Sequence, residues 1–117
     1  MIVIKFGGTS VGTADRVAEA IDIVVERRHL DPIVVVSALA GVTDALVAAA
    51  DAAREQKPDV AASIIAEVRR KHEDVGLRLI QQRQDFFDAF IRQLSKTIDE
   101  VNVILQGFAY LGEITPR

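Results

Sequence analysis

The chain has 117 residues, of which 50% are hydrophobic and 26% are charged, and its formal net charge is −3. Such a length and composition are typical of one soluble globular domain of modest size. The small excess of acidic residues argues against a nucleic-acid-binding protein, whose interface would be a basic stripe. The absence of cysteine excludes disulfides, thiolate nucleophiles and zinc–thiolate sites.

The N-terminus does not have the pattern of a secretory signal, which would be a basic segment, an apolar core and a small-residue cleavage site. The apolar runs are also shorter than the roughly 18 residues that a membrane span needs. We therefore expect a cytoplasmic enzyme or binding domain with no membrane partner. His29 and His72 lie in charged stretches, which favours surface positions over metal ligation.

The first forty residues predict a βαβ unit. A β-branched segment over residues 2–6 ends at Gly7-Gly8, which indicates a strand. Apolar residues three to four apart predict an amphipathic helix over 14–29. A second strand is expected over 33–38, and its unbroken apolar run is typical of a parallel strand buried on both faces. The crossover between the two strands should be right-handed.

The remainder reads as mostly helical. An alanine-rich helix is predicted over 43–56, and Asp59 is expected to cap a helix that ends near Asp74. Gly76 is interpreted as a further break. A long helix then follows, with an apolar stripe formed by Phe86, Phe90, Leu94, Ile98, Val101, Leu105 and Phe108.

The two predicted strands are fewer than the roughly 4–6 that a sheet usually contains. We therefore expect residues 1–117 to be a single incomplete domain, the N-terminal portion of a larger α/β domain.

Lys5 and the glycines after it suggest an anion site. Alternation along the first strand places Ile2, Ile4 and Phe6 on one face and Val3 and Lys5 on the other. Lys5 is therefore expected at the carboxyl end of the strand, the edge where open α/β sheets bind ligands. Gly7 and Gly8 expose backbone N–H groups, and the following helix adds its positive N-terminal end. Together these groups would form a phosphate cradle.

The cradle has a simpler alternative. The stretch matches neither the P-loop nor the dinucleotide-binding pattern. Lys5 could instead be an edge-strand lysine that discourages aggregation, followed by an ordinary glycine turn.

Two hydroxyl residues are expected near the same sheet edge. Ser37 lies at the carboxyl end of the second predicted strand, and Thr43 lies where the next helix starts. Either they line a pocket for a second substrate, or Ser37 bonds its own backbone in a turn and Thr43 is a helix N-cap.

The motifs KFGGTSV (residues 5–11) and VVVSALAGVTDAL (residues 34–46) resemble the signature segments of aspartate kinases, in the amino-acid kinase superfamily. LQGFAYLGE (residues 105–113) also matches that family's layout. The resemblance implies the first part of a three-layer α/β/α kinase domain. It also implies ATP-dependent phosphorylation of the L-aspartate side-chain carboxylate to 4-phospho-L-aspartate, a step towards lysine, threonine and methionine.

The resemblance also implies roles for individual residues. Lys5 would be catalytic, since it would neutralise charge on the transferring phosphoryl group. The ATP phosphates would contact Lys5, Phe6, Gly7, Gly8, Thr9 and Ser10, and the aspartate pocket would include Ser37 and Thr43. Mg²⁺ would arrive with ATP rather than in a protein metal cage. The full-length protein would be a homo-oligomer.

The resemblance leaves part of the family's machinery unmatched. The family's substrate-binding glutamate, its nucleotide-binding half and its regulatory ACT domains have no counterpart here, and Gly112-Glu113 aligns with a non-catalytic helix end. We therefore expect the isolated chain to be inactive. The alternatives are a non-enzymatic anion-binding or interaction module, and a structural α/β fragment whose Phe-rich helix docks a partner.

Overall fold

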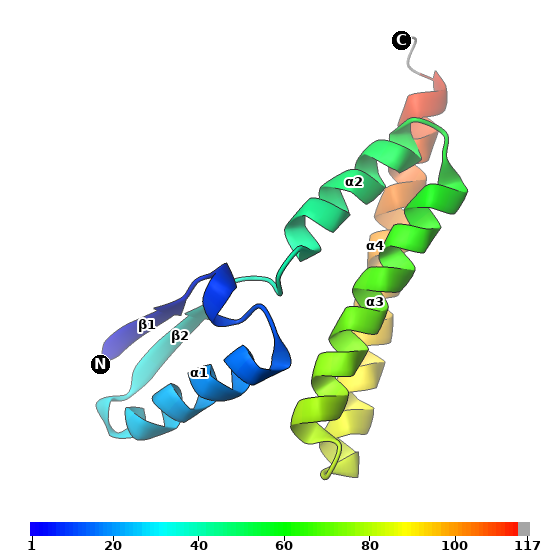
Figure 1. Ribbon diagram of the computed structural model, residues 1–117. Helices are drawn as coiled ribbons and strands as arrows, with labels where there is room; N and C mark the ends of the chain where they lie inside the picture. Colours follow the sequence, from blue (N-terminus) through cyan, green and yellow to red (C-terminus); the bar gives the residue numbers. More distant parts are fainter. Residues whose placement is uncertain (115–117) are drawn as a thin grey trace. The chain divides into compact units, whose positions relative to one another are not determined.

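A computed structural model describes residues 1–114. Its elements are, in chain order, β1 (Ile2–Phe6), the 3₁₀ helix η1 (Gly8–Ser10), α1 (Ala14–Glu26), the 3₁₀ helix η2 (Arg28–Leu30), β2 (Pro32–Val36), α2 (Val42–Arg54), α3 (Pro58–Ile80) and α4 (Gln84–Ile114) (Figure 1). The backbone divides into two compact units, Met1–Val42 and Thr43–Arg117. The predicted βαβ start and mostly helical remainder are confirmed.

The first unit is built around the parallel pair β1 and β2, in which Lys5 lies opposite Val35 and Phe6 opposite Val36. Helix α1 runs along one face of this pair (Figure 1). Phe6 packs there with Val11 and Ala20 in a buried cluster. The predicted alternation along β1 is therefore confirmed, because the side chains on α1's side are covered and Lys5 is exposed.

The burial of strand β2 differs from the prediction. Strand β2 was expected to be buried on both faces, but Ile33 and Val35 are 49% and 45% exposed. Val3, on the neighbouring strand, is 66% exposed. Val34 and Val36, which lie on the α1 side with Ile4 and Phe6, are also 40% and 61% exposed, so β2 is incompletely covered on both faces.

The ends of the first-unit elements follow local chemistry. Helix α1 begins at the predicted Ala14, because Thr13 caps it, and stops at Glu26, three residues earlier than expected. The turn η2 then leads to Asp31, whose φ of 54° lies in the left-handed region. Pro32 starts β2, a strand position that proline tolerates.

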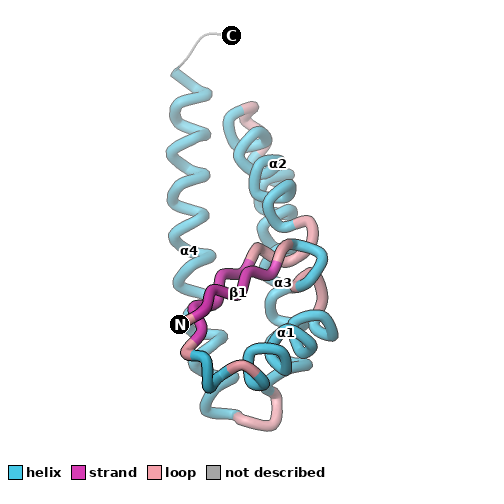
Figure 2. The backbone as a smooth tube through the Cα atoms, turned by 90° about the vertical axis from the view of Figure 1, so that its left-hand side faces the viewer, coloured by secondary structure: helices cyan, strands magenta, loops and turns pink. Residues whose placement is uncertain are grey.

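The second unit is a helical assembly in which α3 and α4 lie side by side, joined by the short turn over 81–83 (Figures 1 and 2). Helix α2 contributes small residues to the same core. The buried cluster consists of Ala49, Ala52, Ala53, Ala61, Ile65, Leu94, Ile98 and Leu105. The apolar stripe predicted for α4 therefore faces this core, except that its outermost members, Phe86 and Phe108, are exposed.

The helix break predicted at Gly76 is wrong. Helix α3 continues through it to Ile80, and Gly76 is buried. A Cβ atom built on Gly76 would overlap the ring of Phe90 on α4. The glycine is therefore a site of close helix–helix packing, because it makes room for an aromatic ring.

The start of α3 also differs from the prediction. Lys57 occupies the N-cap position and Pro58 the first turn, so Asp59 is not the cap. Proline is well suited to that position because the N–H group it lacks would have no partner inside the helix. Asp59 instead lies in the first turn, where a carboxylate interacts favourably with the positive end of the helix.

The end of α4 is held against the turn between α2 and α3. The Gln56 side-chain amide donates a hydrogen bond of 2.6 Å to the carbonyl of Ala109. A Cβ atom on Gly112 would overlap the carbonyl of Arg54. Gly112 thus has a packing role in the last turn of α4. Within residues 1–114, no helix is both long and apolar enough to cross a membrane.

Candidate functional site

The carboxyl ends of β1 and β2 bring the glycine loop next to Ser37. The backbone N–H of Ser37 donates to the carbonyl of Phe6 at 3.1 Å, which extends the strand pairing one residue beyond β2. A Cβ atom on Gly8 would lie 3.7 Å from the Ser37 hydroxyl oxygen. A glycine and a hydroxyl that are 29 positions apart in sequence therefore meet at one edge of the sheet.

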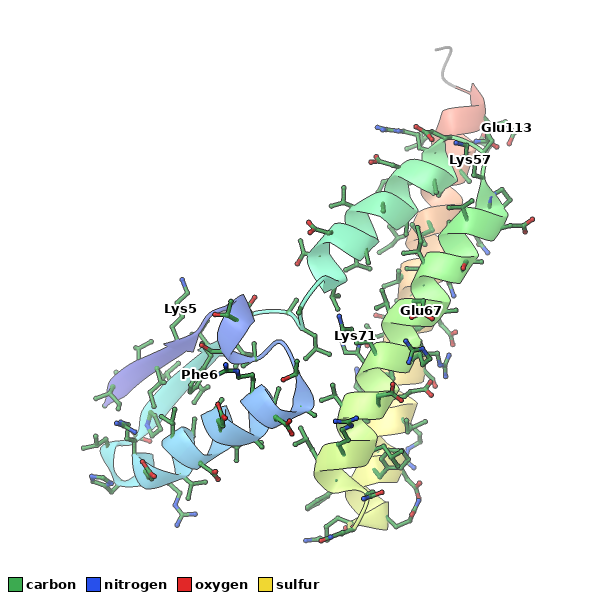
Figure 3. The ribbon with its side chains drawn as sticks, in the orientation of Figure 1. Lys5, Phe6, Lys57, Glu67, Lys71 and Glu113 are labelled. Carbon is green, nitrogen blue, oxygen red and sulfur yellow. The ribbon has the colours of Figure 1, made fainter. Side chains whose placement is uncertain are left out.

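Lys5 projects from the face of the sheet opposite α1, whereas Phe6 points towards α1 (Figure 3). The side chain of Lys5 is exposed. Among the ion pairs of residues 1–114, none involves Lys5. Its ammonium group is therefore open to solvent in the described part of the chain.

Phe6 can contribute to an anion site only through its backbone. Its ring is 7% exposed and belongs to the core cluster with Val11 and Ala20. Its carbonyl already accepts the hydrogen bond from Ser37. The predicted phosphate contact of Phe6 therefore has no side-chain component in this structure.

The loop that follows is a single 3₁₀ turn. Gly7 precedes it with extended backbone angles, φ −75° and ψ 178°, and no side chain caps the turn. The N–H of Ser10 donates to the carbonyl of Gly7 at 3.0 Å. The first two residues of the turn, Gly8 and Thr9, have no helical acceptor for their N–H groups, as at any helix start. Residues 7–10 are all exposed, so these two donors lie at the surface.

The α-helix that was expected to add its positive N-terminal end to the site is α1. Helix α1 does not start directly after the glycines, because the turn η1 and a short link precede it. The hydroxyl of Thr13 accepts a hydrogen bond of 3.3 Å from the N–H of Arg16, which satisfies one of the N–H groups at the start of α1.

Gly12 is a residue of this site that the sequence did not single out. It is buried, and its carbonyl accepts a hydrogen bond of 3.4 Å from the N–H of Ala40. The available signal was a third glycine in the motif, five positions after Gly7. Gly12 joins the loop after β1 to the loop after β2.

Thr43 is the second residue of α2 and belongs to the second unit, whereas Ser37 belongs to the first. It lies inside the helix and therefore does not occupy the N-cap position that one interpretation gave it. Gly41, just before the helix, has a φ of 79°, in the left-handed region that favours glycine.

Several charged groups elsewhere in the described chain form ion pairs, among them Arg70 with Glu67 and Arg83 with Asp85. The guanidinium of Arg70, hydrogen-bonded to Glu67, holds the pKa of that carboxyl below its ordinary value. Arg83 lowers the pKa of Asp85 in the same way. Residues 1–114 contain no group of three or more His, Asp or Glu side chains placed to hold a metal ion.

Comparison with known proteins adds an independent observation. The profile of the amino acid kinase family matches residues 1–113. An aspartokinase of Chlamydia muridarum is 42% identical over 78 residues, which are 67% of this chain and 16% of the relative. A chloroplastic bifunctional aspartokinase/homoserine dehydrogenase of Arabidopsis thaliana is 30% identical over 111 residues, or 95% of this chain and 12% of the relative. The chain thus spans less than a fifth of these relatives.

Proposed function

The chain belongs to the amino acid kinase family, and on that premise we propose that it supplies the phosphate-binding corner of an aspartate kinase. The reaction is transfer of the γ-phosphoryl group of ATP to the side-chain carboxylate of L-aspartate. A carboxylate oxygen attacks phosphorus, the bond to the β-phosphate oxygen breaks, and ADP and 4-phospho-L-aspartate form. The acceptor is already ionised, so no general base is needed.

The observation that carries the proposal is an exposed lysine near the end of β1, followed by a turn with exposed backbone donors that lies next to a hydroxyl. Lys5 is the penultimate residue of β1, Gly8 begins the turn after the strand, and the Ser37 hydroxyl lies next to Gly8. Phosphoryl transfer depends chiefly on positioning and on neutralising charge. Lys5 and the N–H groups of the turn would neutralise the phosphate oxygens, while Ser37 would orient the acceptor.

The remaining ligands follow from the same proposal. Thr43 would contact L-aspartate, and Thr9 and Ser10 would shape the phosphate loop. Mg²⁺ enters with ATP as part of the substrate and is held largely by phosphate oxygens. We propose further that the full-length protein acts as a homo-oligomer in lysine, threonine and methionine synthesis, which the motif resemblance implies; the names of its relatives support the aspartokinase activity alone.

The test is aspartate-dependent release of ADP by the full-length protein, for the parent and for Lys5→Ala. Removing one preorganised charge-stabilising group costs on the order of 100-fold in kcat, and we expect a loss of that size. Lys96→Ala is the matched control, because Lys96 is an exposed lysine on α4 outside the site. Equal turnover in Lys5→Ala and Lys96→Ala would refute the role of Lys5.

We propose in addition that residues 1–117 alone do not turn over substrate, because they span only 12–16% of the two relatives compared above. The purified chain should release no ADP above background with ATP, Mg²⁺ and L-aspartate. Tight binding of ATP–Mg²⁺ to this chain by calorimetry would instead support an anion-binding module.

A further inference from the structure

The space around Gly12 is too small for any side chain. A Cβ atom built on it would lie 3.0 Å from the carbonyl oxygen of Gly8 and 3.1 Å from the Cβ of Ala40. Its φ lies outside the left-handed region, which among the described glycines only Gly41 adopts. The requirement for glycine at position 12 is therefore one of space and not of backbone conformation.

Both neighbours of Gly12 are rigid. The Gly8 oxygen is a backbone atom of the turn over residues 7–10, and the Ala40 Cβ is attached directly to the backbone of the loop after β2. Neither can move out of the way by a side-chain rotation, as the end of a lysine or methionine could. A methyl group at position 12 would therefore push the two loops apart by a few tenths of an ångström.

These two loops are the two halves of the candidate site. They are joined by the hydrogen bond from Ser37 to Phe6 (3.1 Å), by the approach of Gly8 to the Ser37 hydroxyl, and by the hydrogen bond from Ala40 to Gly12 (3.4 Å). The Gly12 contact is the one farthest from the strands, so it sets the separation of the loops where the pairing of β1 and β2 no longer does.

We propose that Gly12 is a positioning residue for phosphoryl transfer, which holds the phosphate turn (residues 7–10) at a fixed distance from the Ser37 loop (residues 37–41). This inference rests on the proposed function. Gly12 itself contacts no substrate in this scheme. Its effect arises because misplacing reacting groups by about 1 Å costs on the order of 100-fold in rate, so a smaller shift still has a measurable cost.

The experiment compares three glycine-to-alanine variants of the full-length protein. Gly12→Ala tests the proposal. Gly76→Ala introduces a clash with Phe90 in the second unit, and Gly107→Ala, on α4, meets nothing within 4 Å. Kinetics are normalised to folded protein by active-site-independent measures such as circular dichroism and thermal unfolding.

We expect Gly12→Ala to lower kcat about tenfold while the KM values for ATP and L-aspartate change less than about threefold, because alignment is lost more than binding. Gly76→Ala should lower the unfolding temperature without changing kcat per folded enzyme. Gly107→Ala should lower neither the unfolding temperature nor kcat.

A rescue variant separates positioning from general damage. Gly12→Ala combined with Ala40→Gly removes one of the two close contacts of the new methyl group. The kcat of the double variant should be at least about threefold higher than that of Gly12→Ala alone. If Gly12→Ala does not yield folded protein, Ala40→Val crowds the same contact from the other loop and should show the same selective fall in kcat.

Two outcomes would overturn the inference. One is a Gly12→Ala enzyme, or its Ala40→Val substitute, whose kcat stays within about twofold of the parent. The other is an equal fall in kcat for Gly76→Ala. If the parent protein shows no aspartate-dependent ADP release, both the proposed function and this inference are refuted. If the parent is active and the Gly12→Ala variant has normal kcat, only this inference is refuted.

Discussion

Replacing Gly76 by alanine gives a direct test of why a glycine lies in the middle of α3. If the glycine only weakened the helix, alanine would stabilise the protein by up to about 1 kcal/mol through its higher helix propensity. The structure indicates the opposite sign. A Cβ atom at this position would lie 2.7 Å from Cδ2 and 3.0 Å from Cζ of Phe90, and it would overlap Cε2.

The size of the effect follows from the surroundings of that ring. Phe90 packs against the buried cluster of the second unit, so it cannot swing freely into solvent. Adding a methylene to a packed interface typically costs about 1–3 kcal/mol. After subtracting a helix-propensity gain of about 1 kcal/mol, a net destabilisation of up to about 2 kcal/mol is expected.

Hydrogen exchange in the amides of α3 and α4 measures this locally, even within a larger protein. A loss of up to about 2 kcal/mol should speed exchange through unfolding by up to roughly 30-fold. Gly107→Ala is the matched control, because it adds the same methyl group to open space and should leave exchange unchanged or slower. Phe90→Leu should reduce the penalty of Gly76→Ala. Slower exchange in Gly76→Ala than in the parent would refute the packing argument.

Three other substitutions give further tests. Thr13→Ala should destabilise α1 by about 1 kcal/mol, seen as faster amide exchange in its first turn, because the hydroxyl that accepts from Arg16 is lost. Ser37→Ala should raise the KM for L-aspartate roughly tenfold in the full-length enzyme with little change in thermal stability, since its backbone and not its side chain pairs with β1. Arg70→Met should raise the pKa of Glu67, followed by NMR titration, towards its ordinary value. Because folding lowers the pKa of Glu67, the ion pair stabilises the protein at pH values above the ordinary carboxyl pKa. This stabilisation is lost as the pH falls through the lowered pKa of Glu67. Both side chains are exposed, so the change in stability should be small.

Local sequence patterns alone were enough to predict most of the helices and strands. Alternation placed Lys5 and Phe6 on opposite faces of β1, and the spacing of apolar residues predicted α1 and the long α4. These features depend on the geometry of one strand or one helix, which is periodic and therefore visible in sequence. The cluster of Lys5, Gly7 and Gly8 was likewise visible because its members are adjacent in the chain.

The tertiary structure decided what the glycines are for and which loops meet. The sequence predicted a helix break at Gly76 and assigned no role to Gly12, whereas the structure places Phe90 beside the first and Ala40 beside the second. The approach of Ser37 to Gly8 follows from the register of β1 against β2, which no single segment encodes. A glycine is selected by what comes close to it, and that neighbour is usually distant in sequence. The sequence therefore determined the elements and the chemistry of KFGGTSVG, while only the packing showed that its last glycine holds two loops together.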